Sequence, residues 1–181
     1  MSTRYASVTV LVALPLWAQD PGSRLPRFED CPAKGIFNGT PSEPALKSSD
    51  ERLFRTVIRQ GVSKGWGVED GTTGREFAAP GPNFAGQYII VRWGCGSPCL
   101  MAAIVDARTG RVFSPPFHHG PGRSYFQVPW AFPMEPPLAY RLDSRLSIAN
   151  ICEVGEAERC GAHYFVMGDD GPKLIHRVLE K

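Results

Sequence analysis

The chain has 181 residues, with 20 Lys and Arg against 18 Asp and Glu, and a formal net charge of +2. A near-neutral chain without a cluster of basic residues is a poor partner for nucleic acid or for an anionic membrane surface, and we expect neither. Its 17 prolines and 19 glycines indicate many turns and short elements, as in a β-rich fold.

The first segment, residues 1–18, has the pattern of a secretory signal peptide. Arg4 supplies a positive charge, residues 6–17 form an uncharged and mostly apolar run, and Ala18 is a small residue suited to cleavage. The run is shorter than the roughly 20 residues that span a bilayer, so we expect no membrane span in the mature chain. Cleavage removes one basic residue and leaves a net charge of +1. We expect a periplasmic or secreted bacterial protein.

Residues 19–48 form a Pro- and Gly-rich lead-in, which we expect to be extended. The remaining residues, 49–181, have a length that suits one domain.

That domain begins with the one predicted helix, residues 49–60, which Ser48 and Glu51 can start with a capping box. Gly61 is placed to end it. An apolar stripe predicts that the helix packs on a sheet. The stripe consists of Leu53, Phe54, Val57 and Ile58.

The rest of the chain alternates between β-rich runs and turns. Residues 106–110 are typical of a hairpin turn in which Gly110 takes a positive φ, and residues 168–171 are typical of a second one. Strands are expected at residues 87–93, 100–105, 111–113, 125–128, 140–151, 163–167 and 173–178. The predicted fold class is therefore α+β: a mostly antiparallel, twisted sheet with one N-terminal helix on its face, stapled by disulfides.

Five cysteines follow the predicted signal peptide, and an oxidising compartment makes disulfides the expected state. Cys95 and Cys99 flank a three-residue turn, and Cys152 and Cys160 flank a seven-residue loop, so these are the expected pairs. Cys31 is left over. A redox site and a zinc site are the alternatives for Cys95 and Cys99. The spacing is one residue too long for Cys-x-x-Cys, and only one tight pair is present, so stapling is favoured.

No catalytic pattern emerges, and we expect no metal and no cofactor. Ser144 does not lie in a Gly-x-Ser-x-Gly elbow. The segment 113–132 is rich in aromatic residues and contains the adjacent pair His118 and His119, which in a loop can both reach a ligand. The aromatic residues either cover the core, which is the favoured interpretation, or form an exposed recognition patch of the kind rich in Tyr and Trp. The residues predicted to bind a ligand are Arg92, Trp93, His118, His119, Tyr125 and Trp130.

Several short motifs together resemble those of a family of small exported bacterial proteins of unknown function. They are FRTxIR at residues 54–59, GPNFAGxY at 81–88, WGCGxxC at 93–99, IVDxxTGxV at 104–112 and YRxDSRL at 140–146. The resemblance covers residues 27–181 and implies a single secreted domain, without implying an activity, cofactor or substrate. Cys31 and the segment 64–79 depart from the family pattern.

These observations predict an exported, non-enzymatic binding or inhibitory module for an unknown protein or small-molecule ligand, acting as a monomer. This prediction rests on the class of protein rather than on a site. The first alternative is a secreted enzyme with a site under the 113–132 segment, in which His118, His119 and Arg92 supply the polar groups. The second is a thiol or metal protein built on Cys95 and Cys99.

Overall fold

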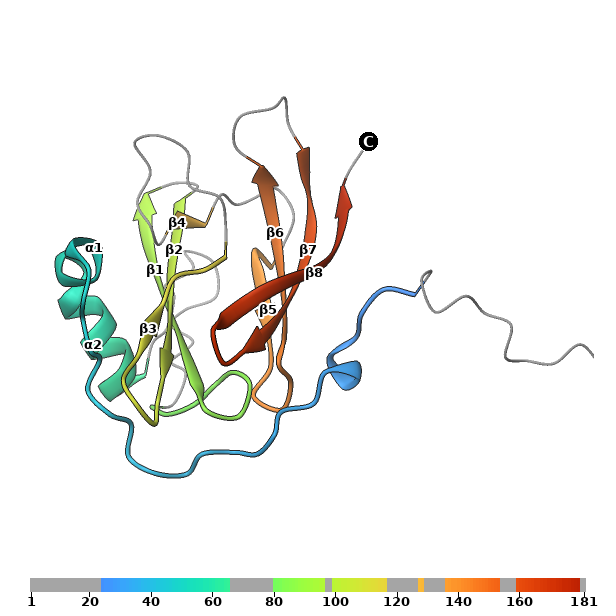
Figure 1. Ribbon diagram of the computed structural model, residues 1–181. Helices are drawn as coiled ribbons and strands as arrows, with labels where there is room; N and C mark the ends of the chain where they lie inside the picture. Colours follow the sequence, from blue (N-terminus) through green and yellow to red (C-terminus); the bar gives the residue numbers. More distant parts are fainter. Residues whose placement is uncertain are drawn as a thin grey trace, which may run out of the picture.

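A computed structural model describes residues 24–65, 80–96, 99–116, 127–128, 136–153 and 159–179. These residues form three layers: two short helices, a first four-stranded sheet and a second four-stranded sheet (Figure 1). The elements are η1 (Phe28–Asp30), α1 (Ser49–Leu53), α2 (Arg55–Lys64), β1 (Tyr88–Gly96), β2 (Cys99–Asp106), β3 (Val112–Phe113), β4 (Gln127–Val128), β5 (Leu138–Tyr140), β6 (Leu146–Glu153), β7 (Arg159–Gly168) and β8 (Gly171–Leu179).

The first sheet is built on β1 and β2, and both of its faces are covered. Ile90 and Ile104 face the second sheet, whereas Val91 and Val105 lie in a separate core on the helix side. Because successive side chains of a strand point to opposite faces, a strand covered on both sides needs apolar residues at nearly every position. This explains the continuous apolar runs of β1 and β2.

The second sheet has the order β5-β6-β7-β8, with every neighbouring pair antiparallel. Cys152 of β6 lies directly opposite Cys160 of β7 and forms a disulfide with it, which confirms this predicted pair. The β7–β8 hairpin turns at residues 168–171, also as predicted. Within the described ranges, no helix is long and apolar enough to cross a membrane.

The antiparallel β structure and the N-terminal helix agree with the predicted class, but the strands form two sheets rather than one. The predicted strand over residues 140–151 also begins later, at Leu146, because residues 141–145 form a turn between β5 and β6. Local alternation identifies a strand without identifying its partner, so it could not separate one sheet from two.

The predicted capping box is confirmed: Ser48 Oγ accepts a hydrogen bond from Glu51 N at 3.1 Å, and Glu51 Oε2 accepts one from Ser48 N at 3.0 Å. The rest of the helix differs from the prediction. It is interrupted at Phe54, and Leu53 is 71% exposed rather than packed on the sheet.

Gly61 was predicted to end the helix but lies inside α2, which continues to Lys64. A Cβ at position 61 would lie 2.3 Å from Cγ1 of Val91 on β1. The missing side chain therefore lets the helix approach the sheet closely. Gly65, with φ of +74°, follows the last helical residue instead.

The 81–88 motif begins with an attachment to the first sheet. The amide of Asn83 binds the backbone of Ile90 on β1 twice, because Oδ1 accepts from Ile90 N at 2.8 Å and Nδ2 donates to Ile90 O at 3.1 Å. Phe84 is fully buried in the core between the sheets. The motif thus anchors the entry to β1.

The same motif then turns towards the second sheet. Ala85 and Gly86 have φ of +49° and +79°, a region that L side chains rarely adopt. Gly86 N donates to Leu142 O, in the turn before β6, at 2.7 Å. The 81–88 motif therefore has a structural role, which is to join the two sheets.

The described part of the predicted lead-in is an extended strap, residues 24–47, that crosses the ends of both sheets (Figure 1). Its backbone hydrogen bonds reach the β5–β6 turn, the 81–88 motif and the β2–β3 turn in succession. They run from Ala33 N to Asp143 O (2.9 Å), Phe37 N to Gly86 O (2.7 Å), Ser42 N to Ala107 O (2.8 Å) and Ala45 N to Gly110 O (2.8 Å).

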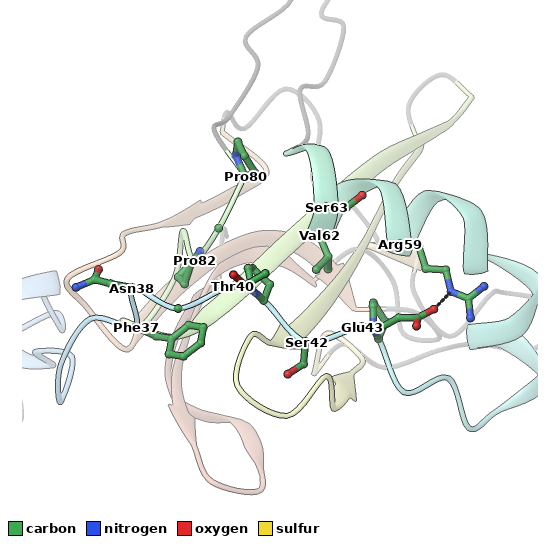
Figure 2. A pocket seen from close by; sticks show the side chains of 14 residues that line it. Phe37, Asn38, Thr40, Ser42, Glu43, Arg59, Val62, Ser63, Pro80 and Pro82 are labelled. Carbon is green, nitrogen blue, oxygen red and sulfur yellow. Dashed lines mark ion pairs between the residues drawn. The ribbon is translucent and has the colours of Figure 1, made fainter.

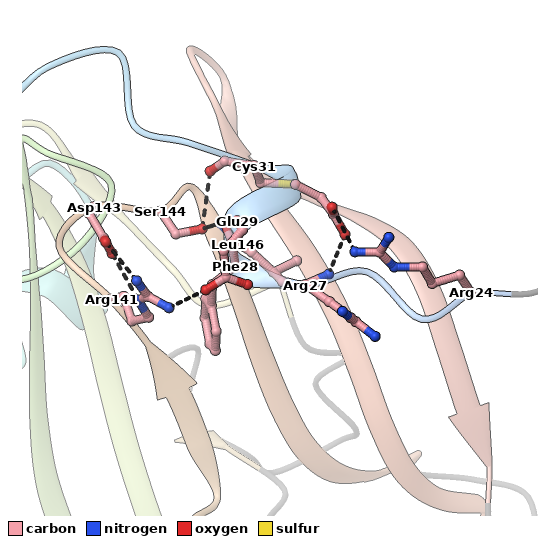
Figure 3. A network of polar contacts seen from close by, with 10 residues as sticks. Arg24, Arg27, Phe28, Glu29, Cys31, Arg141, Asp143, Ser144 and Leu146 are labelled. Carbon is pink, nitrogen blue, oxygen red and sulfur yellow. Dashed lines mark hydrogen bonds and ion pairs between the residues drawn. The ribbon is translucent and has the colours of Figure 1, made fainter. Parts of the chain in front are cut away.

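Ser144, in the β5–β6 turn, is hydrogen-bonded to the strap (Figure 3). Its side chain is 1% exposed. The hydroxyl is within donating distance of Phe28 O (2.7 Å) and Cys31 O (3.0 Å), and it accepts a hydrogen bond from Leu146 N at 3.1 Å. Ser144, which has no catalytic signature in the sequence, therefore has a structural role, which is to anchor the strap.

Arg141 makes a second contact with the strap, at the surface (Figure 3). Its guanidinium donates two hydrogen bonds to Asp143, at 2.8 and 2.7 Å, and one to Glu29 Oε1 at 2.5 Å. It also lies over the ring of Phe28, 5.4 Å from the centroid. Such a bidentate pair is geometrically specific, so Arg141 joins the turn to the strap.

This contact predicts that acid loosens the strap. The hydrogen bonds and charge of Arg141 lower the pKa of Asp143, and a backbone hydrogen bond together with Arg141 lowers the pKa of Glu29. The stabilisation is therefore present above the ordinary carboxyl pKa and is lost as the pH falls through the lowered folded values. Urea unfolding between about pH 6 and pH 2 is expected to show a shallower acid dependence for Arg141→Gln than for the wild type.

Arg24→Gln is the control, since Arg24 pairs with Asp30 at 3.2 Å, on the same part of the strap. Its acid dependence is expected to follow the wild type more closely than that of Arg141→Gln does. Equal slopes for Arg141→Gln and the wild type would contradict the role assigned to Arg141.

Candidate functional site

A pocket of about 830 Å³ lies between the strap, the C-terminal part of α2 and the start of the 81–88 motif (Figure 2). We call it the strap pocket. Its volume is within the range of sites that take small organic ligands. It is lined by Phe37, Asn38, Gly39, Thr40, Pro41, Ser42, Glu43, Pro44, Arg59, Val62, Ser63, Pro80, Gly81 and Pro82.

The apolar wall of the strap pocket is built from Phe37, Val62 and four prolines. The position of Phe37 is fixed by its backbone bond to Gly86. Gly39 allows the ring to fold back along the strap, because a Cβ at position 39 would lie 2.6 Å from the ring atom Cζ. Prolines and a positioned aromatic ring make a wall that loses little entropy when a ligand packs on it.

The polar groups of the strap pocket are of two kinds. Glu43 and Arg59, its only charged lining residues among those described, pair with each other at 3.1 Å (Figure 2). Asn38, Thr40 and Ser63 add uncharged side chains that can donate or accept hydrogen bonds. The pocket therefore offers an apolar wall and neutral hydrogen-bonding groups, with its two opposite charges facing one another.

Two of the residues predicted to bind a ligand, Arg92 and Trp93, are neighbours on β1 and point to opposite faces of the first sheet. Arg92 lies over the ring of Tyr140, 5.5 Å from the centroid, between the two sheets. Burial there raises the pKa of Tyr140, against a smaller lowering effect of Arg92. Trp93 is buried on the helix side, where its ring centroid is 5.4 Å from that of Phe54. Neither residue lines the strap pocket.

The other four predicted binding residues lie outside the described residues. They are His118, His119, Tyr125 and Trp130.

Cys95 is disulfide-bonded. The side chain of Cys99 lies outside the described part of the chain, so the predicted pair of Cys95 with Cys99 lies outside it too. Cys31 is a free, half-buried cysteine on the strap. No group of three or more His, Cys, Asp or Glu side chains in the described ranges could hold a metal ion.

The strap pocket itself was not predicted from the sequence. Its walls come from residues 37–44, 59–63 and 80–82, and nothing in the local pattern of these segments indicates that they meet. The signal that the sequence offers is the proline content of the lead-in together with Phe37, but these features predict only an extended segment.

Compared with protein-family models, with characterised proteins and with solved structures, the chain shows no significant match to any of them.

Proposed function

We propose that the protein is an exported binding module that takes a small, uncharged, amphipathic molecule in the strap pocket. The observation that carries the proposal is the combination of a ligand-sized volume with an apolar, proline-rich wall. Sites for small molecules are mostly apolar, with a few polar groups that set the orientation of the ligand.

The electrostatics of the strap pocket support a neutral ligand. Glu43 and Arg59 form an ion pair at 3.1 Å, so the two charges of the pocket offset one another and give it no net charge that would favour a charged ligand. An uncharged molecule can instead pack on Phe37 and the prolines and bond to Asn38, Thr40 or Ser63.

The disulfide and the N-terminal pattern support export. A cross-strand disulfide such as Cys152–Cys160 forms and persists in oxidising compartments. Residues 1–18 carry the features of a signal peptide. A binding protein in such a compartment meets its ligand outside the cytoplasm.

The test uses the neutral apolar probe N-phenyl-1-naphthylamine and equilibrium dialysis against protein expressed from the full sequence and recovered from the periplasm. Ser63 is exposed on α2 and lines the pocket, so Ser63→Trp fills the pocket without disturbing the core. We expect the wild type to bind the probe saturably and Ser63→Trp to bind it at least about tenfold more weakly, since the probe loses most of its apolar contact.

Lys64→Trp is the matched control, because it adds the same ring at the next helical residue, which is outside the pocket lining. It is expected to bind the probe as the wild type does. Equal binding by Ser63→Trp and Lys64→Trp, or no saturable binding by the wild type, would contradict the proposed site. Absence of the protein from the periplasm would contradict export.

A further inference from the structure

A second pocket, of about 550 Å³, lies where the strap meets the turns of both sheets. We call it the junction pocket. Five segments contribute to it: the strap, the 81–88 motif, the β2–β3 turn, the β5–β6 turn and the β7–β8 hairpin. Nothing in the strap pocket or in its proposed ligand accounts for this second cavity.

Basic side chains dominate the charge around the junction pocket. Four of its lining residues are basic and two are acidic, and the four basic residues come from four different segments. They are Lys34, Arg108, Arg145 and Lys173, against Asp169 and Asp170. The whole chain has a formal net charge of only +2, so the excess of two positive charges around the pocket equals the net charge of the whole chain.

None of these cations forms an ion pair with another residue in the part of the chain that the structure describes. Among the described residues, no ion pair within 4.0 Å involves any of the six charged groups. Arg108 is held by its position over the ring of Phe37, 5.7 Å from the centroid, and Arg145 Nε donates to Pro32 O at 3.3 Å. Both guanidiniums are therefore positioned by the strap, and neither has an anionic partner within 4.0 Å among the described residues.

Two backbone segments that lie close together, the strap and the 81–88 motif, form part of the lining of the junction pocket. Gly35 of the strap and Ala85 line it, and the strap lies so near that a Cβ on Gly86 would be 1.8 Å from Gly35 O. Tyr88, also in the lining, has its pKa raised by burial and by the nearby charges of Asp106 and Asp169. Its phenol is thus a neutral hydrogen-bond donor at neutral pH.

We propose that the junction pocket binds a small organic anion through a phosphate or carboxylate group placed among Lys34, Arg108, Arg145 and Lys173. Arginine presents a planar fork that matches both groups, and lysine adds a mobile point charge. Convergent cations in a concave site strengthen the local field that an anion experiences. The pocket volume exceeds that of a single inorganic anion, which is why we infer an organic ligand that carries the charged group.

The experiment titrates the protein with inorganic phosphate and, separately, with citrate, at constant pH and at ionic strength held with sodium chloride. Backbone amide shifts in NMR spectra report the site. We expect saturable shifts that concentrate at residues 34–35, 85–88 and 168–173, and the tighter of the two anions identifies the group that the pocket prefers. The Lys34→Gln/Lys173→Gln double variant is expected to bind about tenfold more weakly, because two charge-assisted contacts are lost.

The Lys47→Gln/Lys64→Gln double variant makes the same change in net charge at two exposed lysines outside the pocket. It is expected to keep wild-type affinity, and Asp169→Asn/Asp170→Asn is expected to tighten binding. Shifts that fail to saturate with either anion, or an equal loss in both lysine double variants, would overturn the proposal. Because the strap-pocket test uses a neutral probe and a different pocket residue, Ser63, the two proposals can fail independently.

Discussion

Replacing Gly86 by alanine is expected to lower the free energy of unfolding by about 3–5 kcal/mol, as overpacking and a left-handed backbone conformation add together. Gly86 has φ of +79°, and a Cβ there would lie 1.8 Å from Gly35 O and 2.9 Å from Gly35 C. Both neighbouring atoms are backbone, so neither can rotate away. The strap must move, and its bond from Phe37 N to Gly86 O must lengthen or break.

Gly96→Ala separates these two causes. Gly96 also has a positive φ, of +117°, but nothing lies within 4 Å of its added Cβ. The expected loss is therefore only the conformational strain, about 1–2 kcal/mol. Chemical denaturation measures the free energy of unfolding of both variants. If Gly86→Ala loses no more of this free energy than Gly96→Ala does, the close contact between Gly86 and the strap does not contribute to the loss.

Ser144→Ala is expected to lower the free energy of unfolding by about 2–3 kcal/mol, because a buried hydrogen-bonded hydroxyl is removed and its former partners stay buried. Leu146 N loses its acceptor, and Phe28 O and Cys31 O lose their donor. Hydrogen exchange offers a local measurement beside denaturation. The amide of Ala33, which donates to Asp143 O, is expected to exchange faster as this end of the strap loosens.

Ser147→Ala removes the same atom from another buried serine, which lies within β6 opposite Phe165. Its expected cost is below about 1 kcal/mol, and Ala33 exchange should not change. If both serine variants lose the same stability and Ala33 exchanges alike in both, the hydroxyl of Ser144 does not anchor the strap.

The sequence predicted those features whose determinants are local. The Ser48–Glu51 capping box lies within four residues, and the turn closed by Gly110 needs only a positive φ, which is +71° in the structure. Cys152 and Cys160 are separated by eight positions, so proximity along the chain favoured the observed pair. In each case, one short segment holds all the interacting groups.

The features that the sequence did not predict depend on contacts between distant segments. Glycine is a residue type that often ends a helix, yet Gly61 lies inside α2, where the absence of a side chain lets the helix pack against Val91. The apolar runs of β1 and β2 indicated strands but not the layer on each side of them. Both pockets depend on the path of the strap, which a Pro- and Gly-rich segment does not reveal.

The strap also has a consequence for the order in which the chain folds. Its bonds to the hydroxyl of Ser144 join residues 113 and 116 positions apart, and the bond from Ser42 Oγ to Arg108 O spans 66 positions. Contacts this distant close large loops and raise the contact order, which slows folding. During synthesis the strap is the first of these segments to be made, and its partners in the β5–β6 turn are among the last. We therefore expect the N-terminal strap to dock last, and both pockets take shape only when it docks.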